Sequence, residues 1–286
     1  MYLVYGEREK WQDSLLSAIL ILMQSIPSSV SRQDAAFLLR DKYGGKETEA
    51  YRQDLKRLAA GEPLAYIIGW IPFLGLRIFL DARPLIPRPE TEWWTEKLIQ
   101  YLQKNLSKNP LAILDLGAGS GAIGCAILAA LPRARVTFVD KEARYAQTIE
   151  KNIATNGIAR ARVTIRTGDL FNPVAQEKFD IVATNPPYIP LSRTIPLSVE
   201  KYEPLEALRA GEDGLALIRR IAQNARAHLR AKGQVWVEVD SAHARHAEKI
   251  FRAKGMETEL HRDLYGRRRL IIAATNLSRR ASFLIH

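Results

Sequence analysis

LDLGAGSGAIG, residues 114–124, is an apolar run that passes into closely spaced glycines. The run has the pattern of a buried strand, and the residues after the glycines have the pattern of a helix. Gly117, Gly119 and Gly121 allow a tight turn between the two and a close approach of the backbone to a ligand. The stretch therefore predicts a strand–loop–helix unit with a ligand loop at the carboxyl end of the strand.

Strand-like and helix-like segments alternate along the rest of this region. Apolar β-branched runs predict strands at 111–117, 134–140, 161–169, 178–185 and 233–240, with helices between them. This alternation predicts an α/β fold with a mostly parallel, Rossmann-like sheet. METELHRD (256–263) and RLIIAAT (269–275) lie close together, so we expect them to form an antiparallel C-terminal hairpin.

Residues 1–64 have the pattern of a small helical domain. Apolar residues within 11–24 follow a 3.6-residue period. Ser31 followed by Asp34 resembles a helix start, and the glycine at position 44 resembles its end. The stretch 46–63 predicts a third helix, closed by a glycine and a proline.

Residues 65–84 differ in composition from both neighbours. They are rich in aromatic and β-branched side chains and are interrupted by Gly69, Pro72 and Gly75. This predicts a β-hairpin linker. The ligand-binding domain is then expected at 85–286, beginning with a helix near residue 90 and ending in a loosely held basic tail.

Composition limits the classes of protein that fit. The single cysteine, Cys125, excludes an intrachain disulfide and agrees with a reducing, cytoplasmic environment. The apolar run Leu15–Met23 is too short to span a bilayer, so no membrane association is expected. His243 and His246 have no third ligand near them in the sequence, so no metal is expected. The net charge of +11 fits either attraction to polyanions or a solvated basic surface.

Two carboxylates are expected at the same edge of the sheet as the glycine loop. Asp140 ends the second strand, where it can accept both hydroxyls of a ribose. Asp169 follows the third strand, where it can accept from an adenine amino group or simply cap a helix. Leu170 and Phe171 can cover the ring. These residues predict a cofactor that contains adenosine.

The glycine pattern alone leaves the identity of that cofactor open. Gly119, Gly121 and Gly124 also match G-x-G-x-x-G, with Asp140 at about the distance expected for a dinucleotide. A dehydrogenase therefore has to be considered beside a methyltransferase.

ATNPPYIP, residues 183–190, favours the methyltransferase. Pro186 and Pro187 fix their own φ and hold the preceding residues extended, so no helix or sheet ladder continues through them. The stiff backbone points its carbonyls in set directions, and Asn185 adds a side-chain carbonyl. Such a site can accept both hydrogens of a planar –NH2 group, while Tyr188 stacks on a flat substrate.

That arrangement suits methylation of an amide or aromatic amine. The nitrogen is a poor nucleophile because its lone pair is delocalised, and two acceptors on its hydrogens favour a pyramidal nitrogen that is aimed at an electrophile. A sulfonium methyl held by the glycine loop would complete an in-line displacement, in which orientation rather than a strong base supplies the catalysis. We therefore expect Asn185, Pro186 and Tyr188 to be catalytic.

Further motifs narrow the prediction. IPRPETE (86–92) precedes the glycine loop, and YEPLEAL (202–208) and GEDGL (211–215) follow NPPYIP. With these motifs, nearly the whole chain resembles the class I, AdoMet-dependent release factor glutamine methyltransferases, the HemK/PrmC family. The resemblance implies S-adenosyl-L-methionine (AdoMet) as cofactor. It also implies methylation of the glutamine amide in the Gly-Gly-Gln loop of class 1 peptide release factors.

The resemblance also assigns roles by motif position. AdoMet is expected to contact Gly117, Ala118, Gly119, Ser120, Gly121, Asp140, Asp169, Leu170 and Asn185. The substrate glutamine is expected to contact Asn185, Pro186, Pro187 and Tyr188. Arg88 and Glu90 are expected to shape the pocket mouth. Ala118 stands where the family often has threonine, and the unusual VDSAH after Glu238 argues against a role for that residue beyond structure.

Other functions remain open at this point. An amino methyltransferase acting on adenine or guanine in DNA or RNA faces the same acceptor problem and suits the basic charge, but no target-recognition domain is evident. A dehydrogenase leaves NPPY unexplained, and a non-catalytic adaptor that binds AdoMet or associates with the ribosome is a further alternative. We expect a monomer that forms no stable nucleic-acid complex.

Overall fold

The computed structural model describes residues 26–105 and 110–276, which belong to two compact units divided after Ile68. The helix expected at 11–24 and most of the tail expected at the C-terminus lie outside the described residues. Within those residues, no helix is both long enough and apolar enough to cross a membrane.

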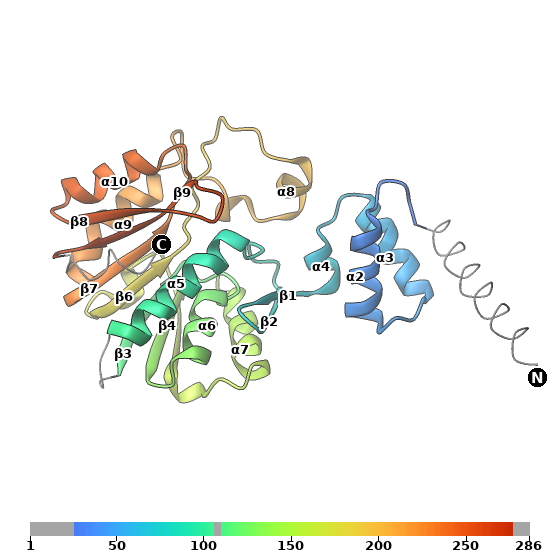
Figure 1. The fold of residues 1–286 in the computed structure, drawn as a ribbon, viewed down its shortest axis with the longest axis horizontal. Helices are drawn as coiled ribbons and strands as arrows, with labels where there is room; N and C mark the ends of the chain where they lie inside the picture. The colour runs from blue at the N-terminus through green and yellow to red at the C-terminus, as the bar shows by residue number, and fades with distance from the viewer. Residues whose placement is uncertain (1–25, 106–109, 277–286) are drawn as a thin grey trace, which may run out of the picture. The chain divides into compact units, whose positions relative to one another are not determined.

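The first unit contains three described helices (Figure 1): α2 (Arg32–Tyr43), α3 (Glu49–Ala59) and α4 (Leu64–Ile68). The predicted start of α2 is confirmed, because the Ser31 side chain accepts a hydrogen bond from the backbone N–H of Asp34 at 3.0 Å. Its predicted end is also confirmed, because Gly44 adopts the left-handed conformation, with φ of 59°, that often terminates helices.

A buried carboxylate connects these three helices. Asp54 of α3 accepts hydrogen bonds from the Lys42 ammonium and the Tyr43 hydroxyl of α2, each at 2.6 Å, and from Arg57 of its own helix at 2.6 Å. Lys42 also donates to the carbonyl of Ile67 in α4 at 2.7 Å. Burial raises the pKa of Asp54, but these donors together hold it below its usual value. The unit is thus fixed by an ion-pair cluster as well as by its apolar core.

The second unit begins with an antiparallel hairpin of β1 (Trp70–Phe73) and β2 (Leu76–Phe79). This hairpin is shorter than the segment 65–84 for which it was expected, because Leu64–Ile68 forms helix α4. Gly69, with φ of 93°, separates that helix from the first strand.

Asparagine side chains bind the hairpin to helix α7 (Tyr145–Thr155). Asn152 accepts from the backbone N–H of Phe79 at 2.7 Å and donates to its carbonyl at 3.1 Å. Asn156 makes the same pair of bonds to Arg77, at 3.0 and 2.9 Å. The hairpin therefore belongs to the second unit by its contacts.

A seven-stranded sheet forms the centre of the second unit. Its strands are β3 (Leu111–Leu116), β4 (Ala134–Asp140), β5 (Val163–Thr167), β6 (Phe179–Thr184), β7 (Leu229–Glu238), β8 (Glu257–Arg262) and β9 (Arg268–Ala274). The order is β5-β4-β3-β6-β7-β9-β8, and β9 alone runs against its neighbours. The predicted Rossmann-like sheet with an antiparallel C-terminal hairpin is confirmed.

Helices cover both faces of this sheet (Figure 1). α5 (Pro89–Asn105), α6 (Ala122–Ala130) and α7 share one buried cluster with the sheet, whereas α9 (Ala216–Ala225) and α10 (Ala244–Ala253) share the other. Ile113 belongs to the first cluster and Leu114 to the second, as the alternation along a strand requires. Helix α8 (Leu197–Tyr202) lies in the connection between β6 and α9.

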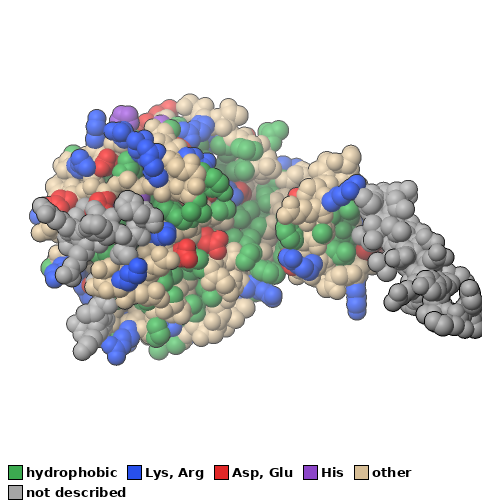
Figure 2. Space-filling view, viewed as in Figure 1, with side chains coloured by type: hydrophobic (Ala, Val, Ile, Leu, Met, Phe, Trp, Pro, Cys, Tyr) green, Lys and Arg blue, Asp and Glu red, His purple; other side chains and the backbone are tan. Residues whose placement is uncertain are grey.

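The charged side chains are distributed over the surface. Figure 2 shows Lys and Arg at many separate points of the visible face, with Asp and Glu among them. The basic side chains of this face are therefore not gathered in one stripe.

Candidate active site

A pocket opens at the carboxyl ends of the parallel strands β3 to β6. The predicted residues that line it are Gly117, Gly119, Asp140, Asp169, Leu170, Asn185, Pro186 and Pro187. They follow four different strands, and the parallel arrangement brings those strand ends to one edge of the sheet. The topology thus joins residues that are far apart in the sequence.

Asp140 holds the glycine loop in place. Its Oδ2 accepts from the backbone N–H of Gly119 at 2.7 Å, and its Oδ1 accepts from the N–H of Glu142 at 2.9 Å. Burial raises the pKa of this carboxyl, while the two N–H groups act in the opposite direction. Gly117 lines the same pocket with φ of 71°, and the position of a Cβ on it has no other atom within 4 Å. The loop therefore offers open space beside a carboxylate, which fits the ribose end of an adenosine cofactor.

Ala118, Ser120 and Gly121 belong to this loop but are not among the lining residues of the pocket. Ala118 and Ser120 are buried. Gly124, the last glycine of the G-x-G-x-x-G pattern, has a packing role, because a Cβ there would lie 2.3 Å from the Phe138 ring. The match to the dinucleotide pattern thus reflects the packing of α6 on β4.

Asp169 and Leu170 follow β5 and line the same pocket as the glycine loop. The Asp169 carboxylate is paired with Arg220 of α9, which lowers its pKa. Leu170 lines the pocket with φ of 49°, a strained conformation for a residue with a side chain. Sequence reasoning did not identify Arg220, which also lines the pocket, because it lies within helix α9, after the GEDGL motif, and is not part of any motif.

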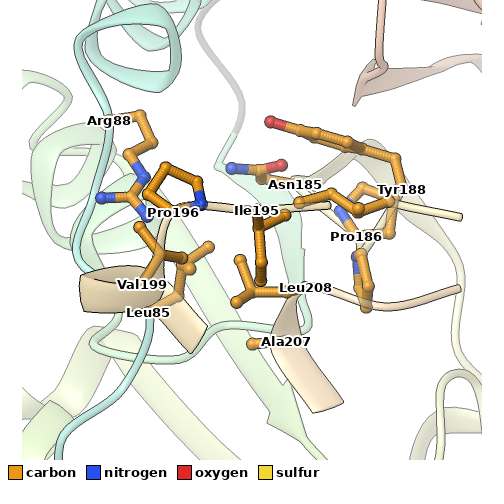
Figure 3. A pocket seen from close by; sticks show the side chains of 12 residues that line it. Leu85, Arg88, Asn185, Pro186, Tyr188, Ile195, Pro196, Val199, Ala207 and Leu208 are labelled. Carbon is orange, nitrogen blue, oxygen red and sulfur yellow. The ribbon is translucent and has the colours of Figure 1, made fainter. Parts of the chain in front are cut away.

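A second pocket shares Asn185, Pro186 and Pro187 with the first. Figure 3 shows Asn185 and Tyr188 on one side of it in this view and Arg88 on the other. The remaining wall is largely apolar and includes Ile195, Pro196, Val199 and Leu208. The rigid Asn185–Pro187 segment is therefore a wall common to both pockets.

The IPRPETE and YEPLEAL motifs meet at the mouth of this second pocket. Arg88 donates to Glu203 Oε1 at 2.6 Å, and the backbone N–H of Ile86 donates to Glu203 Oε2 at 3.2 Å. Glu90 instead accepts from Arg267 at 2.8 Å, in the loop between β8 and β9. Arg88 lines the pocket, whereas Glu90 is not among the lining residues.

The GEDGL motif supports the backbone of NPPY. Gly214 has φ of 73°, and a Cβ on it would lie 2.4 Å from the Tyr188 carbonyl oxygen and 3.0 Å from Pro190. Only glycine allows this close approach. Gly214 thus allows the backbone of NPPY to pack directly against the GEDGL motif.

Glu238, for which the sequence pattern indicated no role beyond structure, contacts the site. It is 1% exposed at the end of β7 and accepts a hydrogen bond from the Tyr188 hydroxyl at 3.1 Å. Burial, together with the neighbouring carboxylate, raises the pKa of Tyr188. Glu238 also accepts from Thr91 at 2.7 Å, and Thr91 accepts from Asn185 at 3.0 Å. No sequence signal singled out Thr91, although it lies within IPRPETE.

In the described part of the chain, no three His, Cys, Asp or Glu side chains are grouped so that they could hold a metal ion. His243 and His246 lie at the start of α10, on the face of the unit opposite α5 and α6.

Comparison with known proteins extends these observations. A family model described as the methyltransferase small domain matches residues 93–196, and one described as the PrmC N-terminal domain matches residues 14–69. A release factor glutamine methyltransferase of Lactococcus lactis is 34% identical over 238 residues, which cover 82% of this chain and 85% of that protein. One of Bordetella pertussis is 36% identical over 224 residues, 77% of this chain and 81% of the relative.

Solved structures agree at the level of the fold. A methyltransferase from Pyrococcus furiosus superposes with a TM-score of 0.52 at 16% identity, covering 79% of this chain and 99% of that one. At such low identity the likeness concerns the architecture alone, and the architecture is that of methyltransferases.

Proposed function

This chain belongs to the release factor glutamine methyltransferase family, and we propose that it methylates the side-chain amide of the glutamine in the Gly-Gly-Gln motif of class 1 peptide release factors. It is an AdoMet-dependent protein-(glutamine-N5) methyltransferase. The observation that carries the proposal for the site is the wall shared by the two pockets, Asn185–Pro187. A cofactor in one pocket and a substrate side chain in the other would both contact this segment.

The first pocket suits the cofactor. Asp140 would accept the ribose hydroxyls, Gly117 and Gly119 would lie against the methionine end, and Leu170 would cover the adenine. AdoMet supplies an electrophilic methyl carbon on a sulfonium. Ala118, Ser120 and Gly121 would shape the loop rather than contact AdoMet directly, in keeping with the burial of Ala118 and Ser120.

The second pocket suits the glutamine side chain. The Asn185 side-chain carbonyl and the backbone carbonyl of Pro186 would accept the two amide hydrogens and turn the nitrogen lone pair toward the first pocket. Tyr188 would stack on the flat amide, and the apolar wall around Ile195 would exclude water. The site needs no strong base, because the proton becomes acidic once the nitrogen carries the methyl group. Orientation and desolvation supply the rate enhancement.

Selection of one glutamine requires more than this pocket. Hydrogen bonds to a single amide contribute a few kcal/mol at most, which is too little to single out one glutamine in a cell. The first unit is proposed to supply a docking surface for the folded release factor. The basic surface would steer an acidic partner, with a rate that falls as salt increases. We further propose that the enzyme acts as a cytoplasmic monomer.

The rival with a specific observation in its favour is methylation of an amino group in nucleic acid, because the net charge is +11. Labelled AdoMet should be offered to the enzyme with intact release factor and with total nucleic acid side by side. We expect label on one glutamine of the release factor, and far slower labelling of a short peptide that contains the same loop. Replacing that glutamine with glutamate should abolish transfer, since a carboxylate has no –NH2 group. Label on RNA or DNA alone would establish the rival.

The role of Asn185 in this scheme predicts a separation of binding from catalysis. Asn185→Ala should lower turnover by about 10²-fold or more, comparable to the loss of one oriented polar group around a transition state. AdoMet affinity should change much less. If turnover and AdoMet affinity fall in parallel, Asn185 serves the cofactor or the fold rather than the amide.

A further inference from the structure

Thr91, Glu238 and Asn185 form a directed hydrogen-bond chain from three separate elements. Glu238 Oε2 accepts from Thr91 Oγ1 at 2.7 Å, and Thr91 Oγ1 in turn accepts from Asn185 Nδ2 at 3.0 Å. Thr91 is 3% exposed and Glu238 1% exposed. Water therefore has little access to either group, and their partners are these protein atoms.

The chemistry of the three groups fixes the direction of the chain. An ionised carboxylate only accepts hydrogen bonds, and a threonine hydroxyl has one proton to donate. Since Thr91 gives its proton to Glu238, its oxygen is left as an acceptor toward Asn185. The amide must then present its –NH2 group to Thr91, and its Oδ1 points the other way.

The same carboxylate has further donors that favour its ionised form. Trp94 Nε1 donates to Oε2 at 2.8 Å, and the Tyr188 hydroxyl donates to Oε1 at 3.1 Å. Burial raises the pKa of Glu238, while its hydrogen-bond donors and the positive charge of Arg269 act in the opposite direction. A proton on Oε2 would be directed against the Thr91 and Trp94 donors, so Oε2 stays an acceptor. The surroundings are thus built for an acceptor.

We propose that Thr91 and Glu238 are positioning residues that hold the Asn185 amide with Oδ1 toward the substrate pocket, and that Glu238 holds the Tyr188 ring at the same time. The inference rests on the proposed function, because an acceptor is needed there only if the substrate offers an –NH2 group. The oxygen and the –NH2 group of an asparagine amide are nearly equal in size, so packing alone does not select one orientation. Without the hydrogen-bond chain, the amide could reverse and present its own –NH2 group to the –NH2 group of the substrate. In agreement, Asn185 Oδ1 has no hydrogen-bond donor among the described residues.

Threonine variants test the orientation with a matched control. Thr91→Val keeps the shape but removes the hydroxyl, and we expect kcat to fall by about 10–100-fold with AdoMet Kd changed less than about twofold. Thr91→Ser keeps the hydroxyl and should retain most of the activity. Thr95→Val is the control, because Thr95 is equally buried one turn along α5 and its hydroxyl bonds only to the Thr91 carbonyl. Unchanged kcat in Thr91→Val would overturn the proposal.

Glu238→Leu tests the direction of the chain. Leucine removes the acceptor for Thr91, whose hydroxyl is then free to donate to Asn185 Oδ1. Glu238→Gln is the matched control, because Trp94 Nε1 only donates and holds the glutamine oxygen in the place of Oε2, where it still accepts from Thr91. We expect Glu238→Leu to lose kcat as Thr91→Val does, with AdoMet affinity retained, and wild-type kcat in this variant would mean that the direction of the chain has no part in catalysis.

A measurement without substrate separates this inference from the proposed function. In the full-length wild-type enzyme, selectively labelled at asparagine and threonine, we expect a nuclear Overhauser contact between the Asn185 side-chain –NH2 protons and Thr91. Asn185→Ala identifies the amide signal by its loss. Absence of the contact would overturn the orientation, whatever the enzyme methylates. If the contact is present but release factor receives no methyl group, the proposed function fails while the orientation stands.

Discussion

The Asp140 carboxylate at the end of β4 has one observed role and one proposed role. Asp140 binds the backbone of Gly119 in the structure and is proposed to bind the cofactor ribose as well. Its position was predictable from sequence, because the end of the second strand of such a sheet faces the ligand. Its bond to the glycine loop was not, because it depends on how the loop closes in three dimensions.

Replacement of this carboxylate should weaken cofactor binding. We expect Asp140→Ala to reduce AdoMet affinity by about 1.5–3 kcal/mol, the scale of hydrogen bonds to a charged group. Asp140→Asn keeps one acceptor oxygen and should lose less. Calorimetric titration with AdoMet gives both values. Wild-type affinity in Asp140→Ala would remove this residue from the cofactor site.

A buried acid below the glycine loop makes stability depend on pH. Asp115 is fully buried, its Oδ2 accepts from the N–H of Gly124 at 2.9 Å, and burial raises its pKa to about 8. The folded state therefore prefers the protonated acid. Its contribution to stability is full below the unfolded pKa of about 3.9 and is lost as pH rises toward 8.

Asp115→Asn should abolish that dependence, since the amide keeps an acceptor for Gly124 but does not ionise. The free energy of unfolding of the wild type should decline relative to the variant by up to about 1.4 kcal/mol per pH unit between roughly pH 4 and pH 8. Urea unfolding at several pH values measures it. A difference that stays constant over this range would show that Asp115 does not titrate abnormally.

Residues of the site were predictable where they follow a strand in a recognisable motif. Asn185 and Tyr188 belong to such a motif, whereas Thr91 and Glu238 are 147 positions apart and meet only when α5 packs beside β7. A hydrogen bond over that separation leaves no local pattern. The sequence therefore offered no sign of the contacts on which the positioning role proposed for Glu238 rests.

Among the elements, the connection that carries GEDGL controls the NPPY segment. Gly214→Ala would place a methyl group 2.4 Å from the Tyr188 carbonyl oxygen. We expect a stability loss of about 1–3 kcal/mol and a fall in kcat, because Tyr188 and Asn185 must move. Thermal unfolding and steady-state kinetics measure the two effects.

Gly157→Ala is the control for that change. Gly157 has a similar left-handed φ of 65°, but a Cβ on it meets no other atom within 4 Å. This variant should carry the backbone strain without the loss of kcat. Equal kcat losses in the two variants would mean that contact with NPPY is not the cause.

Element types were more predictable than element limits. The predicted strands of the sheet all formed, because apolar β-branched runs between glycines and helices leave little choice. The hairpin was misjudged at its start, because Leu64–Ile68 is as apolar as a strand and its helical state depends on packing within the first unit. β7 begins at Leu229, earlier than its expected start at 233, and its pairing with β6 shifts register between Phe179 and Ile181.

On the scale of the whole molecule, the hairpin's bonds to α7 define where the chain can be divided. We expect residues 69–286 to fold and bind AdoMet, but to methylate intact release factor poorly. Residues 85–286 should be less stable, because Asn152 and Asn156 lose their hydrogen bonds to the hairpin and the buried Phe73 and Ile78 are removed. Thermal unfolding, AdoMet titration and methyl transfer distinguish the two fragments.

Full activity of residues 69–286 on intact release factor would contradict the docking role proposed for the first unit. Equal stability of the two fragments would contradict the structural role of the hairpin. The division between a helical part and a methyltransferase part was predictable from the change of sequence period. The attachment of the hairpin was not, because it rests on one asparagine within α7 and one directly after it.

The position of β9 has a consequence for synthesis of the protein. β9 is the last strand within the described residues, yet it lies between β7 and β8 in the sheet. While the nascent chain grows, β7 keeps an unpaired edge until Ala274 has left the ribosome, and such an edge invites aggregation. A messenger truncated before Arg268 would thus yield a polypeptide for chaperones and proteases to remove, and not a partly active enzyme.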